Sequence, residues 1–424
     1  MKTHNQHSLP GPDDITRELL PNGITVLART NFNSPSVVIG GYLPCGSLFD
    51  PDEKLGLADF TASSLLRGSE KRNFQEIFEA LESTGANLSF SAGGHTAGFT
   101  GRCLSEDLPL LLELLAEALR VPVFPGKQVE RLRAQFLTGL ALRAQDTAEM
   151  ASLTFDQIVY AGHPYARPDD GWPETIQAIT RGDLANFHRL HYGPNGLVLA
   201  IVGAVEPKTI ASEVAGVLGD WTNRSQPDLP ALPDLKPLKK TVTRKVKIPG
   251  KSQADLVIGT TGPRRKDPEF MPASLGNSVL GQFGMAGRIG EVVREKSGLA
   301  YYASSSLSAG IGPGAWDVSA GVNPANVQKA RDLICQEIER FVEKGVTAEE
   351  LADSQSNFVG RLPLSLESNA GVVNALLNIE RFDLGLDYYR RYPGLVRAIT
   401  PEDIQVTAGK YLHADKLAIA IAGS

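Results

Sequence analysis

The chain has 424 residues, 42% hydrophobic and 21% charged, which is the balance of a globular protein with more than one domain. Its formal net charge of −6 gives no broad attraction to nucleic acid or to anionic lipid; no dense run of Lys or Arg stands out, and a local basic patch remains open. No apolar run approaches the roughly 20 residues of a membrane span, so we expect neither a nucleic acid nor a membrane as partner.

The N-terminal stretch MKTHNQHSLPGPDD is polar and contains no apolar core of a signal peptide. The three cysteines, Cys45, Cys103 and Cys335, lie far apart, form no C-x-x-C pair and cannot all pair with one another. This usage is typical of reduced thiols in a core, so we expect a cytoplasmic protein, with a disulfide as the alternative.

Taken in chain order, the two halves predict the same series of elements. The first half predicts a strand over 37–43, a helix over 56–66, strands over 86–90 and 97–103, and a helix over 108–119. The second half predicts a strand over 254–260, a helix over 270–280, strands over 300–307 and 315–321, and a long helix over 325–343. Strands in meander-like runs with helices grouped between them favour an α+β fold over βαβ winding.

An internal repeat supports this division. Residues 179–203 and 399–423 align without a gap at an offset of 220, with Thr180 matching Thr400 and Gly203 matching Gly423. In each copy the Thr predicts the N-cap of a short helix, and an apolar strand without alternation follows, so both its faces should be buried. A repeat of this length indicates duplicated domains.

The domain boundary is expected in a proline-rich linker. Residues 222–240, TNRSQPDLPALPDLKPLKK, carry four prolines and no apolar periodicity. We therefore predict a domain over 1–221, a linker over 222–240 and a domain over 241–424. Each domain is expected to be an antiparallel sheet packed with helices.

The stretch 56–69, GLADFTASSLLRGS, resembles the signature of the inverted zinc peptidases, the family of pitrilysin, insulysin and mitochondrial processing peptidase. That signature is roughly G-x-A-H-F-x-E-H-x-L-x-x-G-T. The framework matches, but Asp59 stands at the first His, Ala62 at the catalytic Glu and Ser63 at the second His. The family's third ligand, a Glu on a later charged helix, aligns with Gly139.

These four replacements remove the chemistry that the resemblance would imply. Zinc needs three protein ligands, and one Asp with one Ser does not provide them. We therefore expect no metal and no other cofactor in this chain, and zinc in a partner subunit. A His188-x-x-His191 pair lacks an acid in the required order, and a surface or half-buried pair is the expected reading.

The second half, unlike the first, retains the residues that the family uses there. GMAGRIGEVVREKSGLAYYASSS, residues 284–306, resembles the family's C-terminal stretch, roughly S-R-L-F-x-x-I-R-E-K-R-G-L-A-Y. Arg288 occupies the first Arg position, and Arg294 with Tyr301 occupies the pair that, in the family, binds the substrate backbone beside the metal. The alternative is an Arg near a helix C-terminus and a Tyr packed on a sheet. The long glycine-rich loop of the processing peptidase's non-catalytic subunit is missing at 281–284.

The strand at 86–91, ANLSFS, lies where the family adds substrate peptide as an edge strand, although the family's Asn falls at Ser89. The resemblance covers nearly the whole chain. It implies a non-catalytic subunit of a heterodimeric zinc metallopeptidase that acts on unfolded peptides beside a sister subunit with H-x-x-E-H. The alternatives are a structural subunit, like the core proteins of the cytochrome bc complex, a self-associating peptide-binding protein, and a peptidase that acts alone.

Overall fold

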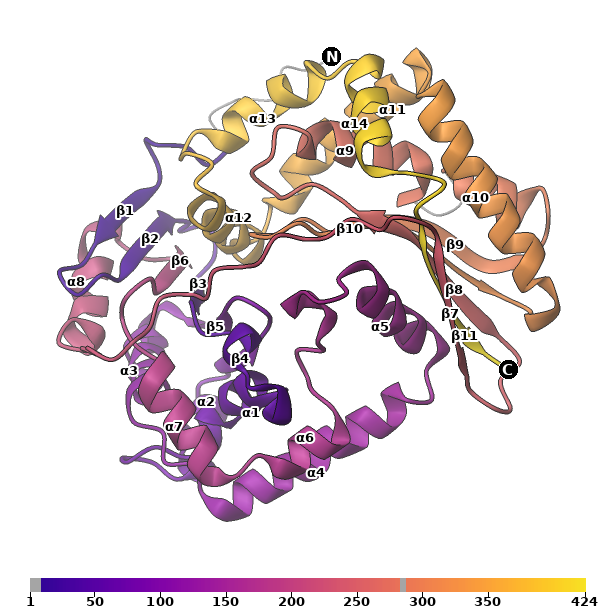
Figure 1. The fold of residues 1–424 in the computed structure, drawn as a ribbon. Helices are drawn as coiled ribbons and strands as arrows, with labels where there is room; N and C mark the ends of the chain where they lie inside the picture. Colours follow the sequence, from indigo (N-terminus) through magenta and orange to yellow (C-terminus); the bar gives the residue numbers. More distant parts are fainter. Residues whose placement is uncertain (1–8, 283–286) are drawn as a thin grey trace. The chain divides into compact units, whose positions relative to one another are not determined.

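The computed structural model describes residues 9–282 and 287–424 (Figure 1). Residues 1–8 at the polar start of the chain and residues 283–284 of the glycine-containing turn at 281–284 therefore lie outside the described residues. Among the residues that are described, no helix has both the length and the apolar character needed to cross a membrane.

The chain forms two compact units, and each unit takes segments from both halves of the sequence. Unit 1 contains residues 1–139, 168–231 and 362–391, and unit 2 contains residues 140–167, 232–361 and 392–424. The segment 222–240 holds no helix or strand.

The sheet of unit 1 has six strands in the order β1-β2-β6-β3-β5-β4. Only β2 and β6 run parallel; the other neighbouring pairs are antiparallel. The strands are β1 (Thr16–Leu19), β2 (Thr25–Thr30), β3 (Ser36–Leu43), β4 (Asn87–Ala92), β5 (Ala97–Leu104) and β6 (Val198–Gly203). β4 has a partner on one side only, so it leaves an open sheet edge.

The helices of unit 1 include one from the far end of the chain. α12 (Asn369–Phe382) packs against β3 and β6. The approach is so close that a Cβ on Gly40 would lie 2.6 Å from Cγ1 of Val373, which explains a glycine inside β3. The others are α1 (Leu57–Ser64), α2 (Phe74–Ser83), α3 (Leu108–Arg120), α4 (Gly126–Arg143), α6 (Pro173–Ala178), α7 (Arg181–His191) and α8 (Pro207–Leu218).

The sheet of unit 2 has five strands in the order β7-β11-β8-β10-β9, with β7 and β9 at its edges. Only β7 and β11 run parallel. The strands are β7 (Val242–Lys247), β8 (Ala254–Thr261), β9 (Ala300–Leu307), β10 (Ala315–Val322) and β11 (Ala418–Gly423).

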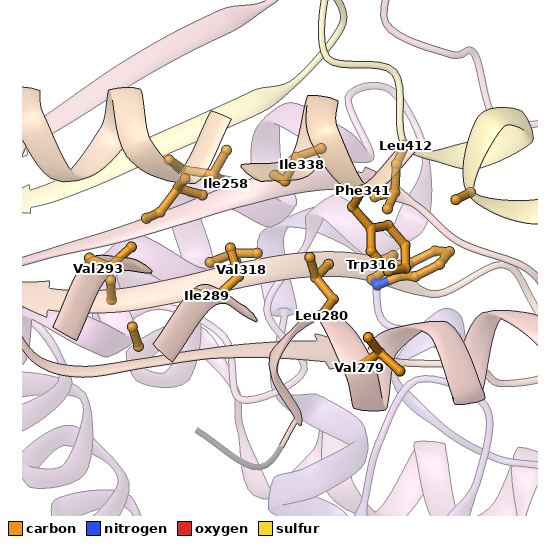
Figure 2. Packing of buried hydrophobic residues seen from close by; sticks show 14 of the residues in the cluster. Ile258, Val279, Leu280, Ile289, Val293, Trp316, Val318, Ile338, Phe341 and Leu412 are labelled. Atoms are coloured by element: carbon orange, nitrogen blue, oxygen red, sulfur yellow. The ribbon is translucent and has the colours of Figure 1, made fainter. Parts of the chain in front are cut away.

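Helices cover both faces of this second sheet. On one face α9 (Phe270–Asn277), α10 (Val327–Lys344), α11 (Ala348–Ser365) and α14 (Pro401–Tyr411) enclose the main core. There the rings of Trp316 and Phe341 meet edge to face at 6.3 Å (Figure 2). α5 (Thr147–Val159), which comes from the first half of the sequence, covers the other face at β8 and β11 (Figure 1).

The structure confirms the internal repeat in detail. Thr180 caps α7 and Thr400 caps α14, each in a capping box with the Asp three residues later. β6 and β11 are buried along their whole length, as the lack of alternation predicted. The expected α+β class, with two sheets that are each packed with helices, is also confirmed.

Candidate functional site

The helix that carries the altered metal signature is held by a buried carboxylate at its start. Asp50, which is 3% exposed, accepts hydrogen bonds at 2.9 Å from the backbone N–H groups of Gly56 and Ala58. The carboxylate therefore satisfies donors that the first turn of α1 leaves unpaired. Gly56 has a φ of 93°, a left-handed conformation that favours glycine.

Asp59 is engaged with the end of the open strand β4. Its Oδ1 accepts a hydrogen bond of 3.0 Å from the Ala92 N–H. Burial raises the pKa of the Asp59 carboxyl, the Ala92 bond opposes that shift, and the neighbouring carboxylates of Asp170 and Asp169 reinforce it. The side chain at the first His position thus joins α1 to β4.

The other altered positions supply no ligand for zinc. Ala62 is a methyl group that is 1% exposed, and Ser63 is half-buried on the same helix. Gly139 lies on α4, which packs on α1 where the rings of Phe60 and Phe136 meet at 5.1 Å. The region expected to provide a third ligand therefore does lie beside α1, but a glycine stands there.

A catalytic zinc does not fit these residues. Its tetrahedral site needs three protein ligands, and these positions offer a carboxylate that is already bonded, a hydroxyl, a methyl and a hydrogen. Within 9–282 and 287–424, no group of three or more His, Cys, Asp or Glu is placed to hold a metal ion. The two histidines of α7 serve packing: His188 Nε2 bonds with the Leu119 carbonyl oxygen, and the ring of His191 contacts those of Phe49 and Phe187.

Arg294 lies on η9 (Gly290–Glu295), a short helix of π type that packs along β9. Val293 points into the core and is fully buried, while Arg294 is exposed. The helix ends at Glu295, and the chain reverses at Gly298, whose φ is 62°. The Gly298 N–H bonds to the Arg294 carbonyl at 2.9 Å, and the next N–H bonds to the Val293 carbonyl at 3.1 Å.

Tyr301 lies two residues into β9, at an irregularity of the strand. Gly321 and Val322 are consecutive on β10, but they pair with Tyr302 and Ala300 on β9. Tyr301 is therefore an extra residue of β9 without a partner on β10. A bulge of this kind turns a side chain away from the regular alternation. Tyr301 is 61% exposed, whereas Tyr302 donates a hydrogen bond of 2.6 Å to Asp255.

Arg288 and Arg294, both matched by the family stretch, have opposite environments. The Arg288 guanidinium donates two bonds of 2.7 Å to Glu350 and one of 3.0 Å to the Gly345 carbonyl, and it lies over the ring of Phe341. The side chains of Arg294 and Tyr301 make no hydrogen bond or ion pair with any other described residue. Arg288 is therefore structural, while Arg294 and Tyr301 retain free donors.

These free donors have a definite chemical use. A guanidinium is always charged and presents a rigid fork of N–H groups, and a phenol adds one directional O–H. Both groups can bind the carbonyl oxygens of a peptide or the negative charge that develops on one during acyl transfer. The geometry places Arg294 and Tyr301 on neighbouring elements of unit 2, and it places Asp59, Ala62 and Ser63 on one helix of unit 1.

Three features of these sites had no signal in the sequence. The cap from Asp50 crosses six and eight residues of irregular chain. The anchor of Arg288 depends on Glu350, which is 62 residues away in the chain. The bulge at Tyr301 depends on the register of two strands, which the side-chain pattern of one strand does not fix.

Comparison with known proteins identifies the family. Residues 178–358 match the description "Peptidase M16 inactive domain", and residues 25–167 match "Insulinase (Peptidase family M16)". The chain belongs to the peptidase M16 family.

Individual relatives match over most of the chain. It is 26% identical to an uncharacterized zinc protease of Streptomyces coelicolor, over 94% of this chain and 87% of that protein. It is also 26% identical to subunit 1 of the human mitochondrial cytochrome b-c1 complex, over 62% of this chain and 55% of that subunit. A solved structure from Pseudomonas fluorescens, described as a peptidase M16 inactive domain, superposes with a TM-score of 0.90 and 26% identity over 97% of this chain and 98% of that chain.

Proposed function

We propose that this chain is the non-catalytic subunit of a heterodimeric zinc metallopeptidase. A sister subunit with the H-x-x-E-H motif would hold the zinc, and this chain would contribute Arg294 and Tyr301 to the binding of an unfolded peptide. The observation that supports the proposal is the contrast within the chain. The metal positions have lost their ligands, while Arg294 and Tyr301 keep exposed donors without partners among the described residues.

The role of the pair follows from its chemistry. The zinc of the sister subunit would supply the activated water. Arg294 would hold a backbone carbonyl of the substrate through its guanidinium, and the Tyr301 O–H would donate to the oxygen on which negative charge develops. Such donors lower the barrier because they are already oriented when the charge forms.

A structural subunit is the second candidate. The similarity to a subunit of the cytochrome b-c1 complex favours it, because that relative is named for the complex to which it belongs. In a purely structural role the donors of Arg294 and Tyr301 would have no function. A peptide-binding homo-oligomer and a peptidase acting alone remain further alternatives. The cytoplasmic location and the lack of zinc in this chain stay predictions.

The test is reconstitution with the sister subunit. The purified chain alone should contain no stoichiometric zinc by elemental analysis and cleave no peptide, and the mixture of both subunits should cleave unfolded peptides. In the mixture, Arg294→Ala or Tyr301→Phe should lower turnover by about ten- to a thousandfold. Arg397→Ala is the matched control, because Arg397 is also exposed near the end of a helix in unit 2.

Three results would contradict the proposal. Near-stoichiometric zinc together with activity in the lone chain would mean that it is a complete peptidase. Unchanged rates in both variants, with the complex still assembled, would favour the structural subunit. A stable homo-oligomer that binds peptides without any sister chain would favour the third candidate.

A further inference from the structure

The edge of the second sheet carries an unusual concentration of positive charge. Seven Lys and Arg residues and no Asp or Glu fall within the 16 residues 236–251 of a chain whose net charge is −6. Pro, Leu, Thr and Val separate them in the sequence, so no continuous run stands out. We call β7 and the residues that flank it the basic edge; Arg244, Lys245 and Lys247 lie on β7 itself, and its flanking cations are Lys236, Lys239, Lys240 and Lys251.

The charges of the basic edge are not neutralised by the rest of the described chain. All of these side chains are exposed except Lys251, which is half-buried. None of the seven makes an ion pair or a side-chain hydrogen bond with any residue of 9–282 or 287–424. Two other cations of the same unit do have acidic partners, in the pairs Arg288–Glu350 and Lys410–Glu269.

The backbone of β7 is open along the same edge. β7 pairs with β11 alone, in a parallel ladder. At the two ends of this ladder, the N–H groups of Val242 and Ile248 bond to the carbonyl oxygens of Leu417 and Gly423 at 2.9 and 2.7 Å. Alternate residues of a parallel strand bond to the same neighbour. The amide and carbonyl groups of Thr243, Lys245 and Lys247 therefore point away from β11, toward the position of an additional strand.

The two faces of β7 differ in the chemistry that they offer to such a strand. Val242 and Val246 pack on the core that α5 covers, with the exposed Arg244 between them. Lys245 and Lys247 alternate with them and so lie on the opposite face. A strand added here would find two valines with Arg244 between them on one face and two lysines on the other.

We propose that the basic edge is a docking site for an acidic, extended peptide segment of a partner protein, which adds to β7 as a sixth strand. Backbone hydrogen bonds to Thr243, Lys245 and Lys247 hold the segment. Its alternating carboxylates pair across the strands with the lysines. This site is independent of Arg294 and Tyr301, so it does not depend on the peptidase role proposed above.

Two observations favour a peptide over another polyanion. The open amide and carbonyl groups need a strand with its own backbone donors and acceptors, and a phosphate backbone or a lipid surface has no donors to offer. Val242 and Val246, on the same face as Arg244, match the apolar positions of an alternating peptide and offer nothing to a phosphate backbone. Lysines on an edge strand can also serve only to prevent unwanted strand pairing, and in that case an acidic peptide would not bind.

The direct test uses the full chain and a fluorescent eight-residue peptide of alternating Val and Glu. Fluorescence anisotropy at low salt should show saturable binding that weakens as NaCl rises from about 50 to about 500 mM, because ions screen exposed charges. The same peptide with Lys in place of Glu should not bind. N-methylation of alternate residues, on the register that faces β7, should weaken binding by about tenfold or more, since it removes the donors that a strand must provide.

A matched pair of charge-reversal variants separates local contact from net charge. Lys245→Glu with Lys247→Glu should weaken binding by about tenfold or more. Lys329→Glu with Lys344→Glu changes the net charge equally at exposed lysines of α10 in the same unit and should change the affinity by less than about twofold. Circular dichroism of both variants checks that they remain folded.

Several results would overturn the proposal. Absence of saturable binding would mean that the lysines serve only to prevent unwanted strand pairing at the sheet edge. Equal weakening of peptide binding by the two variants would mean that the affinity depends only on the net charge of the protein. Undiminished binding of the N-methylated peptide would exclude strand addition, and tighter binding of single-stranded DNA or of phosphatidylserine vesicles would assign the surface to another class of partner.

Discussion

At the scale of single residues, Asp59 shows what has happened to a position that the family signature gives to a metal ligand. Its carboxylate accepts a bond from the Ala92 N–H at the end of β4, so the side chain has a structural contact in place of a metal contact. Burial, reinforced by the nearby carboxylates of Asp170 and Asp169, makes its negative charge unfavourable. The sequence predicted the loss of the ligand, but not this contact, because Ala92 lies 33 residues further along the chain.

Asp59→Asn should stabilise the protein at neutral pH. Burial holds the folded pKa of Asp59 above its unfolded value, so its contribution to stability is fully present below the unfolded pKa and decreases as pH rises through the folded pKa. Asn keeps an acceptor for Ala92 without the charge. We expect a gain of about 1 kcal/mol in the free energy of unfolding at pH 7 and none near pH 3, measured by urea denaturation.

The alanine variant is the control for this prediction. Asp59→Ala leaves the Ala92 N–H without its acceptor and should cost about 1–2 kcal/mol at pH 3, where the charge is absent. An equal gain from Asp59→Asn at both pH values would show that the charge of Asp59 is not the cause.

At the scale of elements, Arg288 and Arg294 belong to one motif but have different roles. Arg288 connects the segment before η9 to α11 through Glu350, while Arg294 on η9 extends to solvent. Sequence similarity gave both positions, but only the structure distinguishes the anchor from the free donor. Burial by itself would raise the pKa of Glu350; the bonds from Arg288 and Thr347 outweigh it and lower that pKa to about 2.

Arg288→Met should destabilise the protein far more than Arg294→Met. We expect losses of about 2 kcal/mol and less than about 0.5 kcal/mol in the free energy of unfolding at pH 7. The stabilisation from Glu350 is present above its ordinary pKa of 4.5 and is lost as pH falls toward 2. The difference between wild type and Arg288→Met should therefore shrink in urea denaturation at pH 3, and a constant difference would contradict this account.

Local patterns predicted the elements well where the cause is local. Thr180 and Thr400 indicated helix starts because a cap needs only the residues of the first turn. The apolar runs of β6 and β11 indicated buried strands. β1, β2 and β7 were not predicted. For β1 and β7 the reason is that both are largely exposed edge strands without a strong apolar pattern. Which sheet each helix would cover was also not predicted, because the apolar face of a helix can pack against either sheet.

At the scale of the whole molecule, the two units exchange helices. α5 comes from the first half of the sequence and covers β8 and β11, and α12 comes from the second half and packs on β3 and β6. The duplication is therefore visible in the sequence at an offset of 220, while the compact units follow different bounds.

Cleavage of the segment 222–240 should not separate the two pieces. We expect a chain with a protease site engineered at residue 230 to give two bands on a denaturing gel after cleavage, yet to elute from gel filtration as one species. Each piece contributes a helix that the core of the other unit needs. The pieces 1–230 and 231–424 expressed singly should lack a cooperative thermal transition. Independent elution of the cleaved pieces would contradict the prediction.

The exchanged helices also constrain how this protein can evolve. A recombination that joined the first half of this gene to the second half of a diverged relative would leave a foreign α12 on β3 and β6 and would place the native α5 on a foreign sheet. Both interfaces would be mismatched at once, at positions as tight as Gly40 against Val373. We therefore expect such a hybrid to be destabilised at both interfaces, and a substitution on one side of either interface to need a matching change on the other side.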